Sequence, residues 1–193
     1  VSEVSARLDP TEAVEDVLAD AMAQGLVSDA TLAATEAQAH ALWALREHVP
    51  EAQRLEGLSI KHDISVAVSR IPGFIEQAGR ELRALLPGIR ICCFGHVGDG
   101  NLHYNQSKPA GLDDAAFRAR EDAIHAVVHG ITAAMGGSIS AEHGIGRLKQ
   151  AAFLQAKAPI AVELMGRIKQ AIDPQGLFNP GRLLPLPGPS SSS

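Results

Sequence analysis

Residues 91–106, I-C-C-F-G-H-V-G-D-G-N-L-H-Y-N-Q, carry two histidines that could bind one metal ion. The dipeptide Asp99-Gly100 predicts a two-residue hairpin turn, because a type I′ turn needs positive φ at both central positions. A turn there places His96 directly opposite His103 on the paired strand. Directly paired side chains have Cβ atoms about 4.5–5.5 Å apart, which is close enough for two imidazoles to share an ion. In the alternative interpretation, both histidines are partly buried and bonded to the main chain.

A carboxylate and a further histidine lie in a second chemically dense stretch, residues 136–149, G-G-S-I-S-A-E-H-G-I-G-R-L-K. Glu142 and His143 stand where a short predicted strand runs into a glycine-rich turn, a common position for metal ligands and catalytic bases. Two imidazoles and one carboxylate leave open positions on Zn²⁺ or a similar ion, as a catalytic metal site requires. The alternative is a surface Glu-His pair without a function.

Two cations could bind a carboxylate. Arg46 lies on the polar edge of L-W-A-L-R-E, and Lys61 lies inside an alternating strand pattern. A guanidinium can bind a carboxylate through two hydrogen bonds, to which a lysine adds a second positive charge. Each of the two residues could equally be an ordinary solvent-exposed cation.

The remaining histidines show no second ligand at a useful spacing. Only His125 and His129, four positions apart, share a helix face, and no acid completes the H-E-x-x-H pattern of helical zinc sites. We therefore expect ordinary polar residues on helix surfaces at His40, His48, His62, His125 and His129.

The composition excludes several classes of protein. The 193 residues carry a net charge of −5, so the chain lacks the basic surface of a nucleic-acid-binding protein. No apolar run reaches the ~18 residues that a membrane span needs, so membrane contact is expected to be at most peripheral. The first residues are charged and lack the apolar core of a secretion signal. The only cysteines, Cys92 and Cys93, point to opposite strand faces, which predicts reduced thiols and a cytoplasmic protein.

The hydrophobic patterns predict alternating helices and strands. Strands are expected at residues 4–8, 30–34, 59–68, 89–96, 102–106 and 138–141. Helices are expected at residues 10–24, 72–86, 113–135 and 150–171, with one more ending near residue 54.

From Ser59 on, the element order is β-α-β-β-α-β, the ferredoxin-like arrangement. We expect an α+β fold with a mostly antiparallel sheet and helices on one face. Residues 1–185 are expected to form one domain, and residues 186–193 a flexible tail rich in proline and serine. In a strict ferredoxin-like strand order Glu142 lies far from the two hairpin histidines, unless its loop reaches back.

Five motifs resemble, in order, those of the C-terminal domain of the FAD-linked oxidases of the vanillyl-alcohol-oxidase type. The branch is the one that holds D-lactate dehydrogenase, the FAD subunit of glycolate oxidase and D-2-hydroxyglutarate dehydrogenase. The motifs are L-W-A-L-R-E (42–47), K-H-D-I-S-V (61–66), F-G-H-V-G-D-G-N-L-H (94–103), G-G-S-I-S-A-E-H-G-I-G (136–146) and D-P-Q-G-L-F-N-P-G-R-L-L (173–184). Together they span nearly the whole chain, which makes the resemblance specific.

The resemblance implies a metal site and a base. His96, His103 and Glu142 match the positions that bind a divalent metal, expected to be zinc or manganese. His143 matches the base that takes the proton from the substrate hydroxyl. Family members that carry these motifs oxidise a D-2-hydroxy acid to a 2-oxo acid and pass a hydride to FAD. A metal on the hydroxyl and a nearby imidazole both favour loss of the hydroxyl proton.

The resemblance also implies how the substrate and the flavin are held. Arg46 and Lys61 match cations that bind the substrate carboxylate, and Asn105 matches a position beside the bound substrate. Asn179, in F-N-P-G, matches a segment that packs back against the flavin domain.

The chain departs from the family pattern in one respect. The FAD-binding half of such an enzyme is N-terminal and is absent from these 193 residues, which we therefore expect to be a fragment or a split-gene product, inactive alone. The expected partner is an FAD-binding domain, in cis or as a separate chain. Two alternatives stay open: a stand-alone module that binds a metal or a small acid without redox activity, and a structural ferredoxin-like interaction domain.

Overall fold

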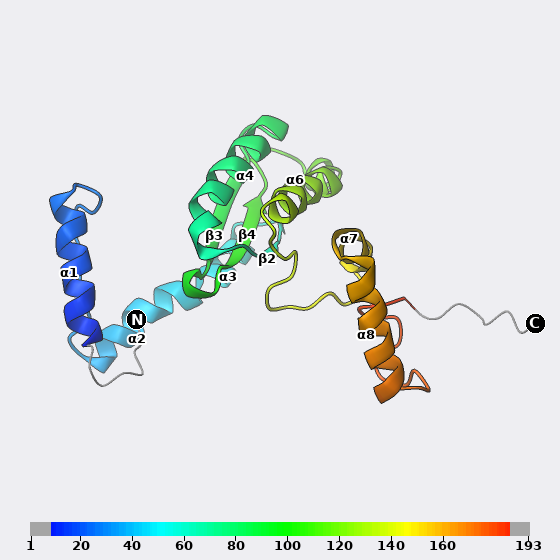
Figure 1. Ribbon diagram of the computed structural model, residues 1–193. Coiled ribbons are helices and arrows are strands. Elements are labelled where there is room, and N and C mark those ends of the chain that lie inside the picture. Colours follow the sequence, from blue (N-terminus) through cyan, green and yellow to red (C-terminus); the bar gives the residue numbers. More distant parts are fainter. Residues whose placement is uncertain (1–8, 186–193) are drawn as a thin grey trace, which may run out of the picture. The chain divides into compact units, whose positions relative to one another are not determined.

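The computed structural model describes residues 9–185, which divide after Glu51 into two compact units. The first unit contains α1 (Pro10–Ala23) and α2 (Glu36–Glu47), and α3 (Val49–Leu55) crosses the boundary (Figure 1). The strand predicted at residues 4–8 and the tail predicted at residues 186–193 lie outside the described residues.

The helices of the first unit begin at side-chain caps. Asp9 accepts a hydrogen bond from the N–H of Thr11 at 2.8 Å, and Thr35 accepts one from the N–H of Gln38 at 3.3 Å. Such caps satisfy N–H groups that have no partner inside the helix. The predicted strand at residues 30–34 is wrong, because these residues form a loop that ends at the cap of α2.

The sheet of the second unit is built around β4 (Asn101–Ser107). β3 (Arg90–His96) pairs with one edge of β4, and both β1 (Ser59–Ile60) and β2 (Asp63–Ser65) pair with the other edge, all antiparallel. β1 and β2 share one register along β4, so they are the two ends of a single strand interrupted at residues 61–62.

The predicted fourth strand at residues 138–141 is reduced to a single bridge between Ser138 and Ser65. The lateral order is therefore Ser138, β1 with β2, β4 and β3, which is the ferredoxin-like order. The prediction of an α+β fold with a mostly antiparallel sheet is confirmed.

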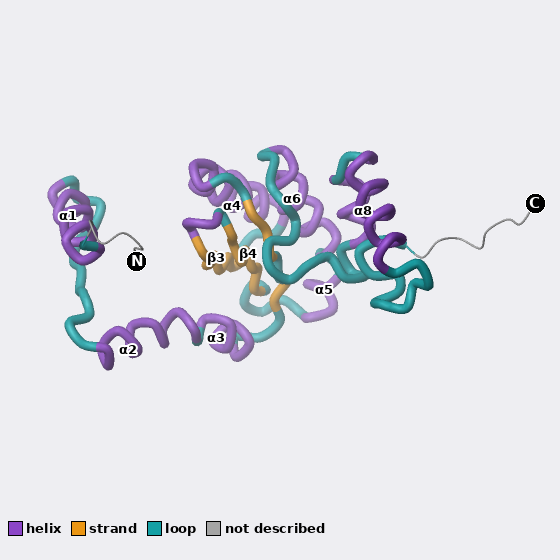
Figure 2. The backbone as a smooth tube through the Cα atoms, turned by 60° about the horizontal axis from the view of Figure 1, so that its bottom comes forward, coloured by secondary structure: helices purple, strands orange, loops and turns teal. Residues whose placement is uncertain are grey.

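Helices α4 (Ile71–Leu85) and α6 (Glu121–Ala134) pack against one face of this sheet, with the short α5 (Asp114–Arg118) before α6 (Figures 1 and 2). Phe74 of α4 meets Tyr104 of β4 edge to face, with ring centroids 5.1 Å apart. The fully buried core side chains from the sheet and the two helices include Ile64, Tyr104, Phe74, Leu82, Ile124 and Val128. Strand residues alternate between faces, so the neighbours of Tyr104 in β4 point away from the helices.

The predicted hairpin register is wrong by two residues. His96 pairs with Asn101, and His103 pairs with Phe94. The turn contains a 3₁₀ segment, Val97–Asp99, followed by Gly100 with φ 69°, instead of the two-residue turn that Asp99-Gly100 predicts. Tertiary contact overrides the local turn preference, because the Gly100 carbonyl accepts the N–H of Val66 at 3.0 Å. A Cβ at position 100 would lie 2.0 Å from the Val66 oxygen, so only glycine fits there.

The last predicted helix is divided into α7 (Gln150–Ala156) and α8 (Pro159–Ile172). Pro159 explains the break, because proline lacks an N–H and forces the preceding residue out of helical geometry. The predicted helix at residues 113–135 is likewise divided, into α5 and α6, and the one ending near residue 54 into α2 and α3. Within residues 9–185, no helix combines the length and the apolar character that crossing a membrane requires.

Candidate metal centre

The candidate residues share the sheet face that points away from α4 and α6. Leu102 and Tyr104 face the helices and are buried in the core, so Asn101 and His103 face the opposite way. Asp63 pairs with His103 and therefore lies on the same face. His96, opposite Asn101, adds an imidazole to this row of polar side chains.

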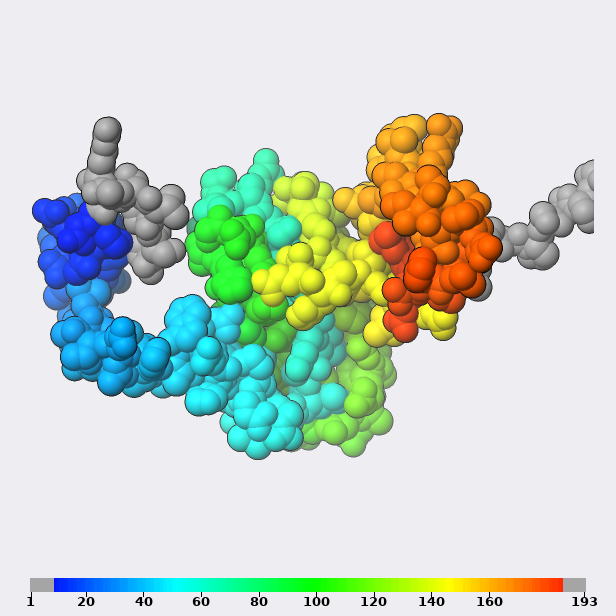
Figure 3. Space-filling view, turned by 90° about the horizontal axis from the view of Figure 1, so that it is seen from below, coloured from blue at the N-terminus to red at the C-terminus, as the bar shows by residue number. Residues whose placement is uncertain are grey.

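Asp63 holds a loop across this face. Its carboxylate, with a side chain only 3% exposed, accepts the main-chain N–H groups of Ala141, Glu142 and His143 at 2.9–3.2 Å. Lys149 adds a cation, with Nζ 3.8 Å from the carboxylate. The loop at residues 139–149 therefore reaches back over the sheet, which resolves the distance problem of a strict ferredoxin-like order. In Figure 3 this loop, in yellow, lies beside the green β3–β4 hairpin.

The charges around Asp63 keep it ionised. Burial raises the pKa of the Asp63 carboxyl. The hydrogen bonds from the N–H groups of His143 and Glu142, together with the charges of His143 and Lys149, lower it by a larger amount, so the pKa is below the ordinary value. Burial also lowers the pKa of the Lys149 ammonium, which the charge of Asp63 partly opposes. The loop is thus attached through a charged carboxylate whose hydrogen bonds all favour its ionised form.

Glu142 brings the two hairpin histidines together. Its Oε1 lies 3.0 Å from Nδ1 of His96, and its Oε2 lies 3.6 Å from Nε2 of His103. Asn101, 4% exposed, donates a hydrogen bond from its side-chain amide to the same Oε1. The two histidines are diagonal neighbours across the ladder rather than direct partners, yet both reach one carboxylate.

His96, His103 and Glu142 are residue types that bind divalent metal ions, but the three residues here whose ligand atoms all lie within 4.8 Å of one another are Asp63, His103 and His143. Two imidazole nitrogens and one carboxylate converge from β3, β4 and the loop, and all three side chains retain some contact with solvent. Nitrogen and carboxylate oxygen are the ligands that zinc takes in catalytic sites, where one position stays open for water or substrate. The structure therefore places a ring nitrogen of each predicted histidine ligand within 3.6 Å of the Glu142 carboxylate, although the predicted register is wrong.

His143 lies beside this group on its exposed side. Its ring is stacked on that of His103, with centroids 5.5 Å apart, and its Nδ1 is 3.7 Å from the Asp63 carboxylate. The side chain is 66% exposed. A shallow pocket extends from His143 towards the C-terminal segment and is lined by Gly146, Lys169, Phe178, Asn179, Arg182 and Leu183. An imidazole that is oriented by a carboxylate and open to solvent is suited to proton transfer.

The predicted substrate residues are placed differently. Lys61 is exposed at the interruption between β1 and β2, two residues before Asp63. Arg46 is half-buried in α2 of the first unit, and its cooperation with Lys61 stays a prediction. Asn105 is buried: its amide donates to Gln53 at 2.8 Å and accepts the N–H of His62 at 3.2 Å.

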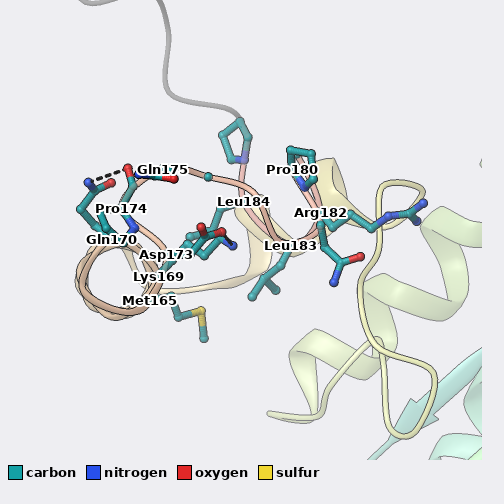
Figure 4. A pocket seen from close by; sticks show the side chains of 14 residues that line it. Met165, Lys169, Gln170, Asp173, Pro174, Gln175, Pro180, Arg182, Leu183 and Leu184 are labelled. Atoms are coloured by element: carbon teal, nitrogen blue, oxygen red, sulfur yellow. Dashed lines mark hydrogen bonds and ion pairs between the residues drawn. The ribbon is translucent and has the colours of Figure 1, made fainter.

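Asn179 lies in the segment that returns along α8, with φ 48°, and faces both the shallow pocket near His143 and a second pocket. Figure 4 shows this second pocket, of about 180 Å³, between the end of α8 and residues 180–185. Its walls include Met165, Asp173, Arg182 and Leu184, and none of the predicted metal ligands lines it. This second pocket, the more enclosed of the two, is therefore separate from the predicted metal ligands.

Three residues of the site were missed by sequence reasoning: Asp63, Asn101 and Lys149. Asp63 could have been found from the strand alternation, since a carboxylate on the polar face of a strand next to a glycine-rich loop is a natural acceptor for loop N–H groups. Lys149 could not, because its contact with Asp63 joins residues far apart in the sequence.

Comparison with known proteins reveals a family for nearly the whole chain. The profile of the FAD linked oxidases, C-terminal domain, matches residues 3–183. The chain is 39% identical over 162 residues to the D-2-hydroxyglutarate dehydrogenase of Xanthomonas citri pv. viticola, covering 84% of this chain and 34% of that protein. It is 39% identical over 174 residues to the mitochondrial D-2-hydroxyglutarate dehydrogenase of Danio rerio, covering 90% of this chain and 31% of the relative. It is 37% identical over 175 residues to the mitochondrial D-2-hydroxyglutarate dehydrogenase of Arabidopsis thaliana, covering 90% of this chain and 30% of that protein. The chain thus spans about a third of the length of these relatives.

Proposed function

We propose, from the premise that this chain belongs to the family of FAD-linked oxidase C-terminal domains, that it is the substrate- and metal-binding domain of an FAD-dependent oxidoreductase. The reaction proposed is the oxidation of a D-2-hydroxy acid to a 2-oxo acid. The observation that carries this proposal is the convergence of His96, His103 and Glu142, with His143 stacked beside them. The names of the relatives make D-2-hydroxyglutarate the first substrate to test.

His96, His103 and Glu142 are proposed to hold a divalent ion, zinc or manganese. When bound, such an ion makes a coordinated hydroxyl more acidic. Asn101 supports the site by bonding to Glu142, and so keeps the carboxylate turned towards both histidines. Ordered partners of this kind commonly raise the affinity of a metal site.

His143 is proposed to take the proton of the substrate hydroxyl. Its neighbour Asp63 orients the ring, because Nδ1 lies 3.7 Å from the carboxylate, which leaves Nε2 to face the substrate. The stacking on His103 places this base next to a proposed metal ligand, so one hydroxyl could meet both. Removal of this proton makes the carbon–hydrogen bond of the alkoxide easier to break.

The substrate carboxylate is proposed to be held by Lys61 and Arg46. Lys61 is exposed and lies two residues before Asp63, so its charge lies at the edge of the same face. A fixed carboxylate determines which hydrogen of the substrate is presented for transfer. Asn105 stays predicted to lie beside the substrate, and in that role it would exchange its bond with Gln53.

FAD is proposed to be bound mainly by an FAD-binding domain, in the same polypeptide or as a separate chain. The family is FAD-linked, and the relatives are about three times as long as this chain. Large apolar side chains exposed on each unit are suited to contact with such a domain: Leu42, Trp43 and Leu45 in α2, and Leu164, Ile168 and Ile172 in α8. Asn179 belongs to the segment proposed to face it. The acidic net charge argues against nucleic acid as a partner, and the proposed location is the cytoplasm, where thiols such as those of Cys92 and Cys93 stay reduced.

The test uses a protein that contains this chain together with its FAD-binding domain, assayed with D-2-hydroxyglutarate and D-lactate. A base that only moves a proton contributes about 10²–10⁴-fold to the rate, so His143→Ala should lower kcat by that factor and keep its metal. Glu142→Ala should lose both activity and metal. The matched control is His40→Ala, on exposed α2 surface, which should change neither.

The proposal is contradicted if His143→Ala loses its metal together with Glu142→Ala, because His143 would then be a ligand. A protein that binds the metal and the acid but transfers no electrons from either substrate to FAD would favour the alternative of a binding module without redox activity.

A further inference from the structure

A second group of histidines lies on the other face of the same strand. His62 precedes Asp63, so its side chain points towards the helices while that of Asp63 points towards the loop. It meets His125 and His129, which are one turn apart on α6. Ring centroids are 4.7 Å apart for His62 and His125, and 5.3 Å for His62 and His129. The expectation of an ordinary helix-surface residue is wrong for His62, which is buried at the interruption between β1 and β2 and contacts both histidines of α6.

The hydrogen bonds around His62 fix which of its nitrogens is free. Its Nδ1 lies 3.1 Å from the carbonyl oxygen of Tyr104, which can only accept, so Nδ1 carries the proton. Nε2 therefore has a lone pair, and it lies 2.7 Å from Nδ1 of His125. Histidines that bind metals usually donate their other N–H to a carbonyl or a carboxylate in this way.

His125 and His129 of α6 both turn their rings towards His62. Their rings are stacked 5.4 Å apart with an interplanar angle of 12°, so both present an edge to His62. Nε2 of His125 lies 3.6 Å from the Glu121 carboxylate, one turn earlier on α6. One ring nitrogen from each histidine can be chosen such that all three lie within 4.8 Å of one another. Glu121 supplies a carboxylate acceptor outside this set of three nitrogens.

Burial and neighbouring charges lower the pKa of two of these imidazoles, those of His62 and His129. Burial, together with repulsion by His125 and His129, lowers the pKa of His62 to about 3. Burial, followed by the charges of His125 and Lys149, lowers the pKa of His129 to about 4. Metal ions bind neutral imidazole. Lys149 opposes a cation at this place, but its ammonium is also 3.8 Å from the Asp63 carboxylate.

We propose that His62, His125 and His129 form a second metal-binding site, for a divalent ion that prefers nitrogen ligands, Zn²⁺ in the first place. Three imidazoles without a carboxylate ligand favour zinc and its neighbours over magnesium, calcium or manganese. The ion would lie between Nε2 of His62 and Nδ1 of His125, in place of the proton that these two nitrogens share. The His125 ring would then carry its hydrogen on Nε2, which faces Glu121. Zinc binds imidazole nitrogens at about 2.0–2.1 Å, so the distance of 2.7 Å between Nε2 of His62 and Nδ1 of His125 must increase slightly when the ion binds. His125 and His129 are partly exposed, so water can occupy the fourth position.

Such an ion would join α6 to the strand segment between β1 and β2. This segment carries Lys61 and Asp63 on either side of His62, so the site would stabilise the position of both. We assign it a structural role, since its ligands face the helices rather than the loop at residues 139–149.

The experiment titrates the 193-residue chain with Co²⁺, whose visible absorption reports four-coordinate binding, and then displaces it with Zn²⁺. It is done in a His103→Ala background, so that the proposed catalytic ion does not contribute and failure of that site leaves this test unaffected. We expect one ion per chain in this background. Loss of a residue that hydrogen-bonds to a metal ligand lowers metal affinity by ~10–100-fold, so adding Glu121→Gln should weaken Co²⁺ binding by about that factor. Adding His129→Ala or His125→Ala removes a ligand and should weaken Co²⁺ binding by more.

The control adds His40→Ala, which removes an exposed histidine of α2 and should leave binding unchanged. His125 and His129 are replaced rather than His62 because they are only partly buried, and an unchanged circular dichroism spectrum shows that each variant folds. The proposal is overturned if the background protein binds no ion. It is equally overturned if folded His129→Ala and His125→Ala variants bind Co²⁺ with unchanged stoichiometry and affinity.

Discussion

Asp63 and Asp173 hold two different loops of this chain by the same device. Each side chain is 3% exposed, accepts main-chain N–H groups from a loop and contacts a lysine. Asp63 receives the N–H groups of residues 141–143, and Asp173 those of Leu177 and Phe178 at 2.9 Å. Both carboxyl groups have a pKa below the ordinary value. They differ in what they hold, since Asp173 ends α8, whereas Asp63 holds the loop that carries Glu142 and His143.

The two carboxylates also differ in how far along the sequence their partners lie. Asp173 binds N–H groups four and five residues ahead, and its lysine lies four residues behind, so the whole turn is local. The loop bound by Asp63 lies 78–80 residues away. A local turn forms with its helix, whereas a distant contact can form only after the sheet has aligned the two segments. We therefore expect changes at Asp63 to affect stability and the proposed metal site together, and changes at Asp173 to affect stability alone.

Asp63→Ala should have the largest effect on stability. It leaves three loop N–H groups and the partly buried Lys149 without their acceptor, which we expect to cost about 3 kcal/mol in the free energy of unfolding. The measurement is urea unfolding followed by circular dichroism. Asp99→Ala, in the exposed hairpin turn, is the matched control and should stay within about 0.5 kcal/mol of the wild type. Equal stability of the two variants would mean that Asp63 does not hold the loop.

Gly137→Ala tests the start of the same loop without changing any charge. A Cβ there would lie 2.2 Å from the Ser65 oxygen and 2.9 Å from Cγ2 of Thr132, so the bridge between Ser138 and Ser65 must move. Overpacking of this kind costs about 1–3 kcal/mol. Gly130→Ala, on open surface of α6, should instead raise stability by up to about 1 kcal/mol. We expect the free energy of unfolding to fall for Gly137→Ala and to rise for Gly130→Ala. An unchanged value for Gly137→Ala would contradict the close contact between position 137 and the Ser65 oxygen.

Acid titration should reveal the smaller contribution of Asp173. The hydrogen bond from Lys169 is the main reason that its pKa is lowered to about 2. The unfolded chain binds the proton near pH 4, earlier than the folded chain does, so the stability that this group contributes above pH 4 is lost as pH falls towards about 2. Asp173→Asn should therefore have a shallower loss of stability in this window and lower stability at pH 7. An unchanged slope in the acid limb would contradict the pKa shift.

The sequence could predict what depends on local pattern. The order of elements from Ser59, the cap at Asp9 and the end of α8 at Asp173 all follow from residues a few positions apart. The hairpin register could not be predicted, because Asp99-Gly100 favours a two-residue turn in isolation, whereas the contact of Gly100 with Val66 selects a longer one. The error did not separate the histidines, since a shift of two residues keeps both on one face.

Contacts between distant elements account for the rest. His62 looked like a lone histidine because its neighbours His125 and His129 lie more than 60 residues away on α6. Asp63 stood within a recognised motif, yet only the paired strands show that it faces the loop at residues 139–149. Helix breaks were missed where a single proline decides, as at Pro159.

The most direct test of the central claim, that Asp63 assembles the proposed metal centre, is a comparison of metal affinity between Asp63→Ala and Asp173→Ala. Both are made in a His129→Ala background, so that only the site at His96, His103 and Glu142 is measured by titration with Zn²⁺. Asp173→Ala should bind one ion per chain with unchanged affinity. Folded Asp63→Ala should bind about 10–100-fold more weakly, as expected when a supporting partner outside the ligand set is lost. Equal affinity in the two variants would contradict the account.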